Sequence, residues 1–405
     1  MTSVHTRYAS RLSGFAAATA LTGAVGFMTI PVLISAGGAQ TWAVLAFGQA
    51  IGGVGMVLTG WGWNISGAAE AALLDRDQAN ELLLRSVAIR LKLVVPVCGA
   101  AAAVAFLLAP ADPVLAATSA AAFSLNGLSA AWFYTGMRAP RTLIVREVVP
   151  RTAFIVLGLL VCLLTRSIGP FPAFLAAGCL AAVVLNVTGA GGSPFGLFAS
   201  HGRNSLPELR RQLPAVFTTL TSTLYLATPT VFVGLIAPQD LAIIALADRL
   251  FKTVNMAASP ILNVLQGAIP SRDPDVFRQR VRKGLTAVLG LGVGGGVLFA
   301  VGAPLVAPLI SGGQTQLPLA VTIPFGLTVL ATYLSQVVGL SCLITLGRVR
   351  SVAISATVGA VIGVPVLLVG SALAGAAGAA VGEAIAEVAV TVYQLWSLRN
   401  GMRRL

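Results

Sequence analysis

The chain has 405 residues, of which 57% are hydrophobic and only 10% are charged, and its mean hydropathy is +0.90. A water-soluble protein of this length has no use for so much apolar surface, so the composition indicates a polytopic helical membrane protein. The net charge of +13 would also suit a nucleic-acid-binding protein, but the positions of the basic residues argue against one.

Twelve long apolar segments follow one another along the chain. They are continuous rather than alternating, and most exceed the ~18 residues that a transmembrane helix needs. We therefore expect an all-α polytopic membrane protein with about twelve transmembrane helices. The segments are residues 12–35, 42–63, 93–109, 114–136, 143–164, 171–188, 213–236, 241–268, 285–310, 317–346, 352–373 and 376–396.

The basic residues predict the orientation of these helices. Of the 26 lysines and arginines, all except Arg166, Arg249 and Lys252 fall in segments on one side of the predicted topology. The positive-inside rule makes that side the cytosol and places both termini there. Anionic membrane lipids are then the expected partners of the basic excess, and nucleic acid is not. Arg90 belongs to this group, at the end of a predicted cytosolic helical extension with a solvated face, residues 68–90.

An internal repeat predicts the domain organisation. Residues 42–49 align without gaps on residues 241–248, which places Gln49 on Asp248. We expect an N-terminal six-helix half (1–190), a cytosolic linker (191–212) and a C-terminal six-helix half (213–405). With six spans each, the halves are parallel, and such proteins bind substrate in a central cavity near mid-membrane.

The segment 240–267 carries the first candidate site. It is as apolar as a transmembrane helix, yet it contains Asp248, Arg249 and Lys252, and intramembrane charges usually face a protein interior or a wet cavity. Asn255 and Asn263 continue the same stripe, which is roughly 80° wide. These residues are candidates for binding a polar or anionic substrate. The alternative is that Asp248 merely pairs with Lys252 one turn away.

Glu383 and Glu387 form a second candidate site, one helical turn apart in the last apolar segment. Like charges in a low dielectric favour protonation, so the two carboxylates could couple transport to a proton or another cation. The alternative is that they neutralise basic residues of neighbouring helices.

Charged and aromatic residues near the inner ends of the fourth and fifth segments form a third candidate. Arg146 and Arg151, with Glu147 between them, are either snorkelling topological charges or the rim of a cavity that attracts an anionic substrate. Trp132 and Tyr134 have two possible roles: stacking on the rings of a sugar, or packing against neighbouring helices.

Nothing in the sequence points to catalysis. No Asp-rich, HExxH, GxSxG or P-loop motif occurs, and the short connections leave no sizeable aqueous domain. The four cysteines lie singly in apolar segments and read as core residues. We therefore expect a protein that is not an enzyme and that uses no cofactor and no metal.

Four stretches, in this order, resemble the Wzx-type polysaccharide flippases of the multidrug/oligosaccharidyl-lipid/polysaccharide (MOP) superfamily. They are Trp-Gly-Trp-Asn-Ile-Ser-Gly at 61–67, Trp-Phe-Tyr-Thr-Gly at 132–136, Ala-Ile-Ile-Ala-Leu-Ala-Asp-Arg at 242–249, and the segment from Gly375 to Glu383. Asp248 and Arg249 stand where the family has an acid and a base. The family's usual Tyr is Ile244 here.

The resemblance implies a flippase that moves a polyprenyl-pyrophosphate-linked oligosaccharide across the bacterial cytoplasmic membrane by alternating access. Its partners would be a polysaccharide polymerase and glycosyltransferases of the same pathway. The alternative within the superfamily is a cation-coupled multidrug exporter, which would depend more on the carboxylates than on the basic residues.

Overall fold

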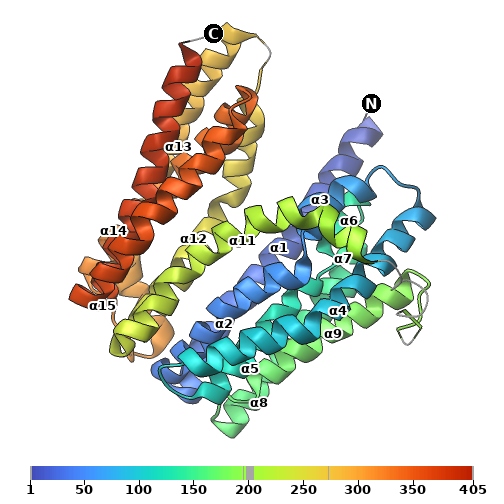
Figure 1. Cartoon of the computed structure of the whole chain (residues 1–405), viewed down its shortest axis with the longest axis vertical. Coiled ribbons are helices and arrows are strands. Elements are labelled where there is room, and N and C mark those ends of the chain that lie inside the picture. The colour runs from blue at the N-terminus through green and yellow to red at the C-terminus, as the bar shows by residue number, and fades with distance from the viewer. Residues whose placement is uncertain (1, 195, 198–204, 272, 404–405) are drawn as a thin grey trace. The chain divides into compact units, whose positions relative to one another are not determined.

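The computed structural model describes residues 2–194, 196–197, 205–271 and 273–403. Within these residues every regular element is helical and no strand occurs (Figure 1). The all-α fold class is therefore confirmed. The chain divides into two compact units, residues 1–227 and 228–405, which are described separately.

Unit 1 is a bundle of antiparallel helices joined by short turns. Its long helices are α1 (Thr2–Gly37), α2 (Ala39–Gly60), α4 (Arg76–Leu108), α5 (Pro113–Ser124), α8 (Val149–Thr165) and α9 (Phe171–Gly189). Short elements lie at the ends of these helices: α3 (Trp63–Ala71), η1 (Leu125–Leu128), α6 (Ala131–Gly136), α7 (Pro140–Leu143) and the π-helical turn η2 (Ile144–Val148). The closest packing joins α2 to α5, α4 to α5, and α8 to α9.

The stretch 68–90, predicted as a helical extension with a solvated face, packs into the core by its other face. Asp75 caps α4 by accepting a hydrogen bond from Gln78 N at 2.9 Å, and the helix then continues unbroken into the apolar segment. Leu83, Val87 and Ile89 are 1% exposed. They pack in one hydrophobic cluster with Trp63, Trp132, Phe133 and Tyr134. The charged residues predicted to form the solvated face are exposed, whereas Arg90 at the end of the stretch is buried. The exposed residues are Asp75, Arg76, Asp77, Glu81 and Arg85.

The first turns of α11 (Ser205–Ile236) are fixed to the turn between α2 and α3. Trp61 Nε1 donates to Leu209 O at 2.9 Å, Ser66 Oγ donates to Gln212 Oε1 at 2.8 Å, and Arg211 Nη2 lies 2.8 Å from Glu70 Oε1. These contacts hold the end of the predicted linker against unit 1.

Only glycine suits position 62 of that turn. Gly62 has φ 84°, and a Cβ there would lie 3.0 Å from Gln212 Oε1. The Trp-Gly-Trp stretch, which the sequence analysis identified, is thus the surface on which the first turns of α11 pack.

Unit 2 contains the rest of α11, the turn η3 (Pro238–Asp240), α12 (Leu241–Ala268), α13 (Pro274–Ser311), α14 (Leu319–Val337), the π-helical turn η4 (Val338–Leu343) and α15 (Val349–Met402). The last of these is two helices rather than one. Its backbone leaves helical geometry at Ala374 and Gly375, and the two arms fold back so that Gly370 and Gly378 meet. We call residues 349–373 the first arm and residues 376–402 the second arm.

The number of membrane-spanning helices agrees with the predicted segments. Nine helices within the described residues are long and apolar enough to cross a membrane, and α15, counted once among them, supplies two by its break. Two further helices have the length of a span: α12, which carries three charges, and α11. Each of the twelve predicted segments therefore lies in a helix or in a run of consecutive helices.

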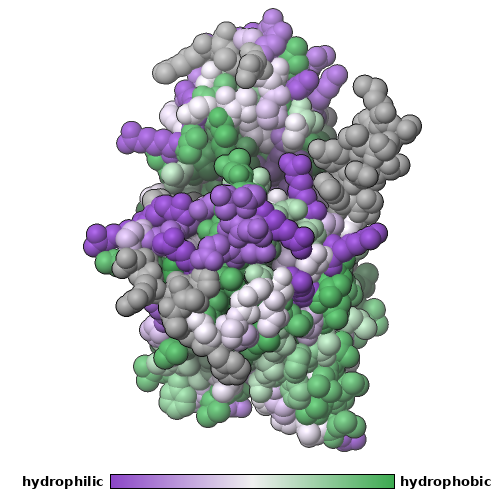
Figure 2. Space-filling model, turned by 90° about the vertical axis from the view of Figure 1, so that its right-hand side faces the viewer, coloured by the Kyte–Doolittle hydropathy of each residue, from purple (hydrophilic) through white to green (hydrophobic). Residues whose placement is uncertain are grey.

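The surface fits contact with lipid. Along α13, Leu289, Val293, Val297 and Val301 are spaced by one helical turn and are 47% to 60% exposed. Exposed apolar stripes of this length are expected where a helix faces hydrocarbon. On the face shown in Figure 2, hydrophobic residues cover a broad area, and hydrophilic ones gather in a separate region. The protein is a multi-pass membrane protein.

The boundary between the packing units lies at Ala227, inside α11. The prediction placed the end of the linker at residue 212, which lies near the beginning of the same helix. The functional division into six-helix halves remains a prediction, because packing alone does not show which residues move together.

Candidate functional site

The charged residues predicted on α12 and α15 lie together in unit 2. Lys252 Nζ donates to Asp248 Oδ2 at 2.6 Å, and their side chains are 45% and 14% exposed. The pairing that the sequence offered as an alternative is therefore present. It leaves the Lys252 ammonium half-exposed, with room for a second anionic partner.

A hydrogen bond from a backbone N–H to a side-chain carboxylate sets the register between α12 and the second arm of α15. Asp240, just before α12, accepts a hydrogen bond from Ala376 N at 3.0 Å, at the start of the second arm of α15. The helices descend from the same level, so Asp248 stands level with residue 384 and Lys252 with residue 388. Glu383 and Glu387 follow Ala376 by 7 and 11 residues, which places the four charged side chains within about 8 Å of each other in depth, or one and a half helical turns.

Gly375 makes this contact possible. Its φ is 53°, and an added Cβ would run into the carboxylate of Asp240. The sequence analysis noted Gly375 only as the start of a family-like stretch, and its role depends on the fold-back of α15.

Glu383 is the most buried of the four, with 4% exposure. Its charged neighbours are Asp248, Glu387 and Lys252. Its Oε2 accepts no hydrogen bond within the part of the chain that the structure describes. Burying an ionised carboxylate without donors costs several kcal/mol, so this oxygen is a place where a proton or another cation is stabilising.

Arg249 and Asn255 lie on α12, each three residues from Lys252. Arg249 is half-buried, and Asp248 is its electrostatic neighbour. Asn255 Oδ1 is buried and receives no hydrogen bond from the described residues. Both can therefore offer polar atoms beside Lys252.

The far end of the predicted stripe lies apart from the charge cluster. Asn263 is exposed and lies 11 residues beyond Lys252, which is ~17 Å along the helix. Between them, the hydroxyl of Ser259 donates to Met256 O at 2.8 Å. The structure thus brings Asp248, Arg249, Lys252 and Asn255 together and leaves Asn263 apart.

The third candidate group, in unit 1, forms a buried network. Glu147 lies 2.9 Å from Arg151 Nη2 and accepts from Asn186 Nδ2 at 2.7 Å. Tyr134 OH donates to Asn186 Oδ1 at 2.6 Å. Arg151 also donates to Asn126 Oδ1 at 2.9 Å. The side chains of Glu147 and Arg151 are only 5% and 18% exposed, so they do not extend to the membrane–water interface. Their interpretation as snorkelling charges was wrong.

Arg146 and the aromatic residues complete this region. The guanidinium of Arg146 packs on Gly189, where a Cβ would collide with it. Trp132 and Tyr134 are 4% and 2% exposed, so they pack in the core and offer no face to a sugar. Of this group, only Arg146 is positioned at the edge of the buried network.

Sequence reasoning missed Arg90, which it assigned to the cytosolic charges. Arg90 is fully buried and donates to Gly127 O at 3.0 Å and to Ser129 O at 2.9 Å. The rings of Trp63 and Trp132 each lie 5.9 Å from its guanidinium carbon. The hydrogen bonds and cation–π contacts hold the charge in place. The available signal was its position inside a run of apolar residues.

The geometry defines a multi-pass membrane protein in which a cluster of opposite charges lies within two helices of membrane-spanning length. No protein-family model matches the sequence, and no curated protein matches it. Solved structures match its fold. The chain is similar to the lipid II flippase MurJ in an inward closed conformation, with TM-score 0.69 and 14% identity over 96% of this chain and 89% of that one.

Two multidrug transporters are similar as well. An inward-facing MATE family transporter of the MOP superfamily gives TM-score 0.63 and 14% identity over 96% of this chain and 95% of that one. A mutant of the Vibrio cholerae MATE transporter VcmN gives TM-score 0.51 and 16% identity over 100% and 99%. The chain therefore has the fold of these transporters.

Proposed function

We propose that the protein is a flippase that moves a polyprenyl-pyrophosphate-linked oligosaccharide from the inner to the outer leaflet of the bacterial cytoplasmic membrane. Lys252 carries the proposal, because its ammonium is half-exposed on a helix of membrane-spanning length and is held in place by Asp248. A diphosphate can add charge-assisted hydrogen bonds to Lys252 and to the guanidinium of Arg249 without displacing core residues.

The rest of the site fits this role. Asn255 supplies neutral polar atoms beside the cations, as a sugar requires. Within unit 1, Arg146 carries a positive charge that attracts an anionic lipid, whereas the charge of Arg151 is balanced by Glu147. The likeness of the fold to a lipid II flippase supports a lipid-linked substrate. A polysaccharide polymerase and glycosyltransferases would act before and after the flippase, and both of its termini would lie in the cytosol.

One observation favours a second function. Glu383 is a buried carboxylate next to Glu387, and the fold also resembles MATE multidrug transporters. A cation-coupled exporter of cationic drugs would use these carboxylates and would gain nothing from Arg249 or Lys252.

Binding by the purified protein in lipid vesicles separates the two functions. A flippase binds a polyprenyl pyrophosphate disaccharide, and Arg249→Ala or Lys252→Ala weakens this binding by about 1.5–3 kcal/mol, the range for hydrogen bonds to charged groups. Lys283→Ala removes an exposed positive charge from α13 and serves as the matched control. Unchanged binding by the Arg249→Ala, Lys252→Ala double variant, or preferential binding of a cationic drug, contradicts the flippase.

A further inference from the structure

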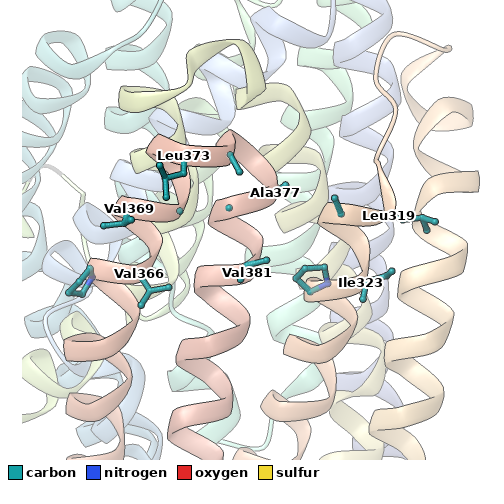
Figure 3. A pocket seen from close by; sticks show the side chains of 13 residues that line it. Leu319, Ile323, Val366, Val369, Leu373, Ala377 and Val381 are labelled. Atoms are coloured by element: carbon teal, nitrogen blue, oxygen red, sulfur yellow. The ribbon is translucent and has the colours of Figure 1, made fainter.

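Unit 2 contains an apolar groove that the proposed transport site does not use. It has a volume of about 850 Å³, and every residue that lines it is apolar. Figure 3 shows Ile323 of α14, Val369 and Leu373 of the first arm of α15, and Val381 of the second arm around it. Leu373, Val369 and Ile323 are 82%, 58% and 57% exposed, so the groove is open on the outside of its unit.

The depth of the groove corresponds to one leaflet. From Ala374 to Pro365 the lining spans nine residues of helix, ~14 Å, which is about half of the ~30 Å hydrocarbon core. It begins at the end of the unit where the connections, residues 312–318 and 374–375, contain no lysine or arginine. By the positive-inside rule this is the outer leaflet.

A hydrocarbon chain suits such a site better than water or an extended peptide does. Water would find no polar partner in it, and a peptide would leave its backbone groups unsatisfied. The inner end of the groove is level with the charge cluster, because Val381 precedes Glu383 by two residues on the same arm. The two side chains point to roughly opposite faces of that helix, ~200° apart. The charged face suits the anionic head of a lipid, and the groove suits its long apolar tail after the head has left the cations.

We propose that this groove binds the polyprenyl chain of the lipid-linked oligosaccharide on the outer-leaflet side, as the substrate leaves the cations of α12. The inference rests on the proposed function and adds a second subsite for the same substrate. Burial of the chain stabilises the lipid in the orientation of the product, with its tail in the outer half of the bilayer, and so favours forward transport over return.

Photolabelling in proteoliposomes tests the groove directly. One probe is a polyprenyl pyrophosphate disaccharide with a diazirine near the far end of its chain, and the other is a phosphatidylglycerol with a diazirine in its acyl chain. The polyprenyl probe should label α14 and both arms of α15 several-fold more than the exposed face of α13 around Val297, and excess unlabelled polyprenyl lipid should abolish the difference. Equal labelling of the groove by both probes, without competition, overturns the inference, because the groove then holds bulk lipid.

Filling the groove supplies the second measurement. Ile323→Trp and Val369→Trp should lower both groove labelling and transport several-fold, while binding of a short-chain pyrophosphate disaccharide stays unchanged. Val301→Trp on α13, an equally exposed apolar position outside the groove, is the control. Normal transport by both groove variants contradicts the inference. If the wild-type protein transports the lipid but labels uniformly, the groove inference alone fails, and if it neither binds nor transports the lipid, the proposed function fails.

Discussion

The carboxylate of Asp240 accepts a hydrogen bond from the backbone N of Ala376 at 3.0 Å. This contact joins the start of α12 to the second arm of α15, although 136 residues separate them in the chain. It sets the depth at which Glu383 lies close to Asp248, so the composition of the candidate site depends on one turn about two helical turns away from the charges.

Gly375→Ala should disturb this register. Alanine is strained at a φ of 53°, and its Cβ would collide with Asp240, so we expect destabilisation of more than about 1 kcal/mol. Gly312→Ala is the matched control, since Gly312 has φ 59° with no atom within 4 Å of an added Cβ. Thermal unfolding in detergent should show a larger decrease for Gly375→Ala. Equal decreases would mean that backbone strain, and not the contact with Asp240, sets the cost.

The ion pair between Asp248 and Lys252 can be tested by exchanging its charges. The double variant Asp248→Lys, Lys252→Asp keeps a pair one turn apart, so its membrane abundance should be close to that of the wild type. Export of the glycan in a flippase-null strain should nevertheless fall at least tenfold, because the cation has moved one turn along the helix, away from Asn255. Each single substitution leaves two like charges and serves as the control for the pairing. Full export by the exchanged variant would show that the pair is only structural.

Neutralising the two carboxylates should change the energetics of transport rather than the fold. Glu383→Gln with Glu387→Gln removes two negative charges close to Lys252, so binding of the pyrophosphate head should tighten. Dependence of transport on a proton or sodium gradient should disappear at the same time. Transport into vesicles with and without each gradient measures this. Unaltered gradient dependence would assign the carboxylates to neutralising their basic neighbours.

Arg90 should tolerate no replacement. Lysine cannot reproduce the donors that reach Gly127 O, Ser129 O and Ser86, and the buried carbonyls would lose partners. We expect Arg90→Lys to destabilise the protein by about 3 kcal/mol, measured as a decrease in unfolding temperature in detergent. Arg85→Lys, an exposed site on the same helix, should change stability by less than about 0.5 kcal/mol. Similar results for the two variants would contradict the buried role of Arg90.

The predicted orientation can be examined with single cysteines in a variant that lacks the four native ones. Cysteines at Gln40, Asp112, Gln239 and Gln314 are exposed and should react with an impermeant thiol reagent added outside the cell. Cysteines at Gln78 and Asp275, also exposed, should react only after the membrane is opened. Labelling of two of the first group only from the cytosolic side would overturn the twelve-span topology.

The sequence by itself determined the fold class and the number of spans. Each transmembrane helix must be long and apolar to satisfy its backbone in lipid, and this requirement is local, so it is visible in runs such as residues 285–310. The sequence also showed which residues are unusual for such helices. Asp248, Lys252 and Glu383 stand out because an intramembrane charge is costly wherever it lies.

Only the tertiary structure decided how those charges are used. Arg90 and Arg85 look alike in the sequence, yet one is buried between Trp63 and Trp132 and the other is exposed. Glu383 meets Asp248 and Lys252 because α15 breaks at Gly375 and folds back onto Asp240. Such pairings depend on contacts between residues more than one hundred positions apart, and no local pattern of hydrophobicity or charge encodes them.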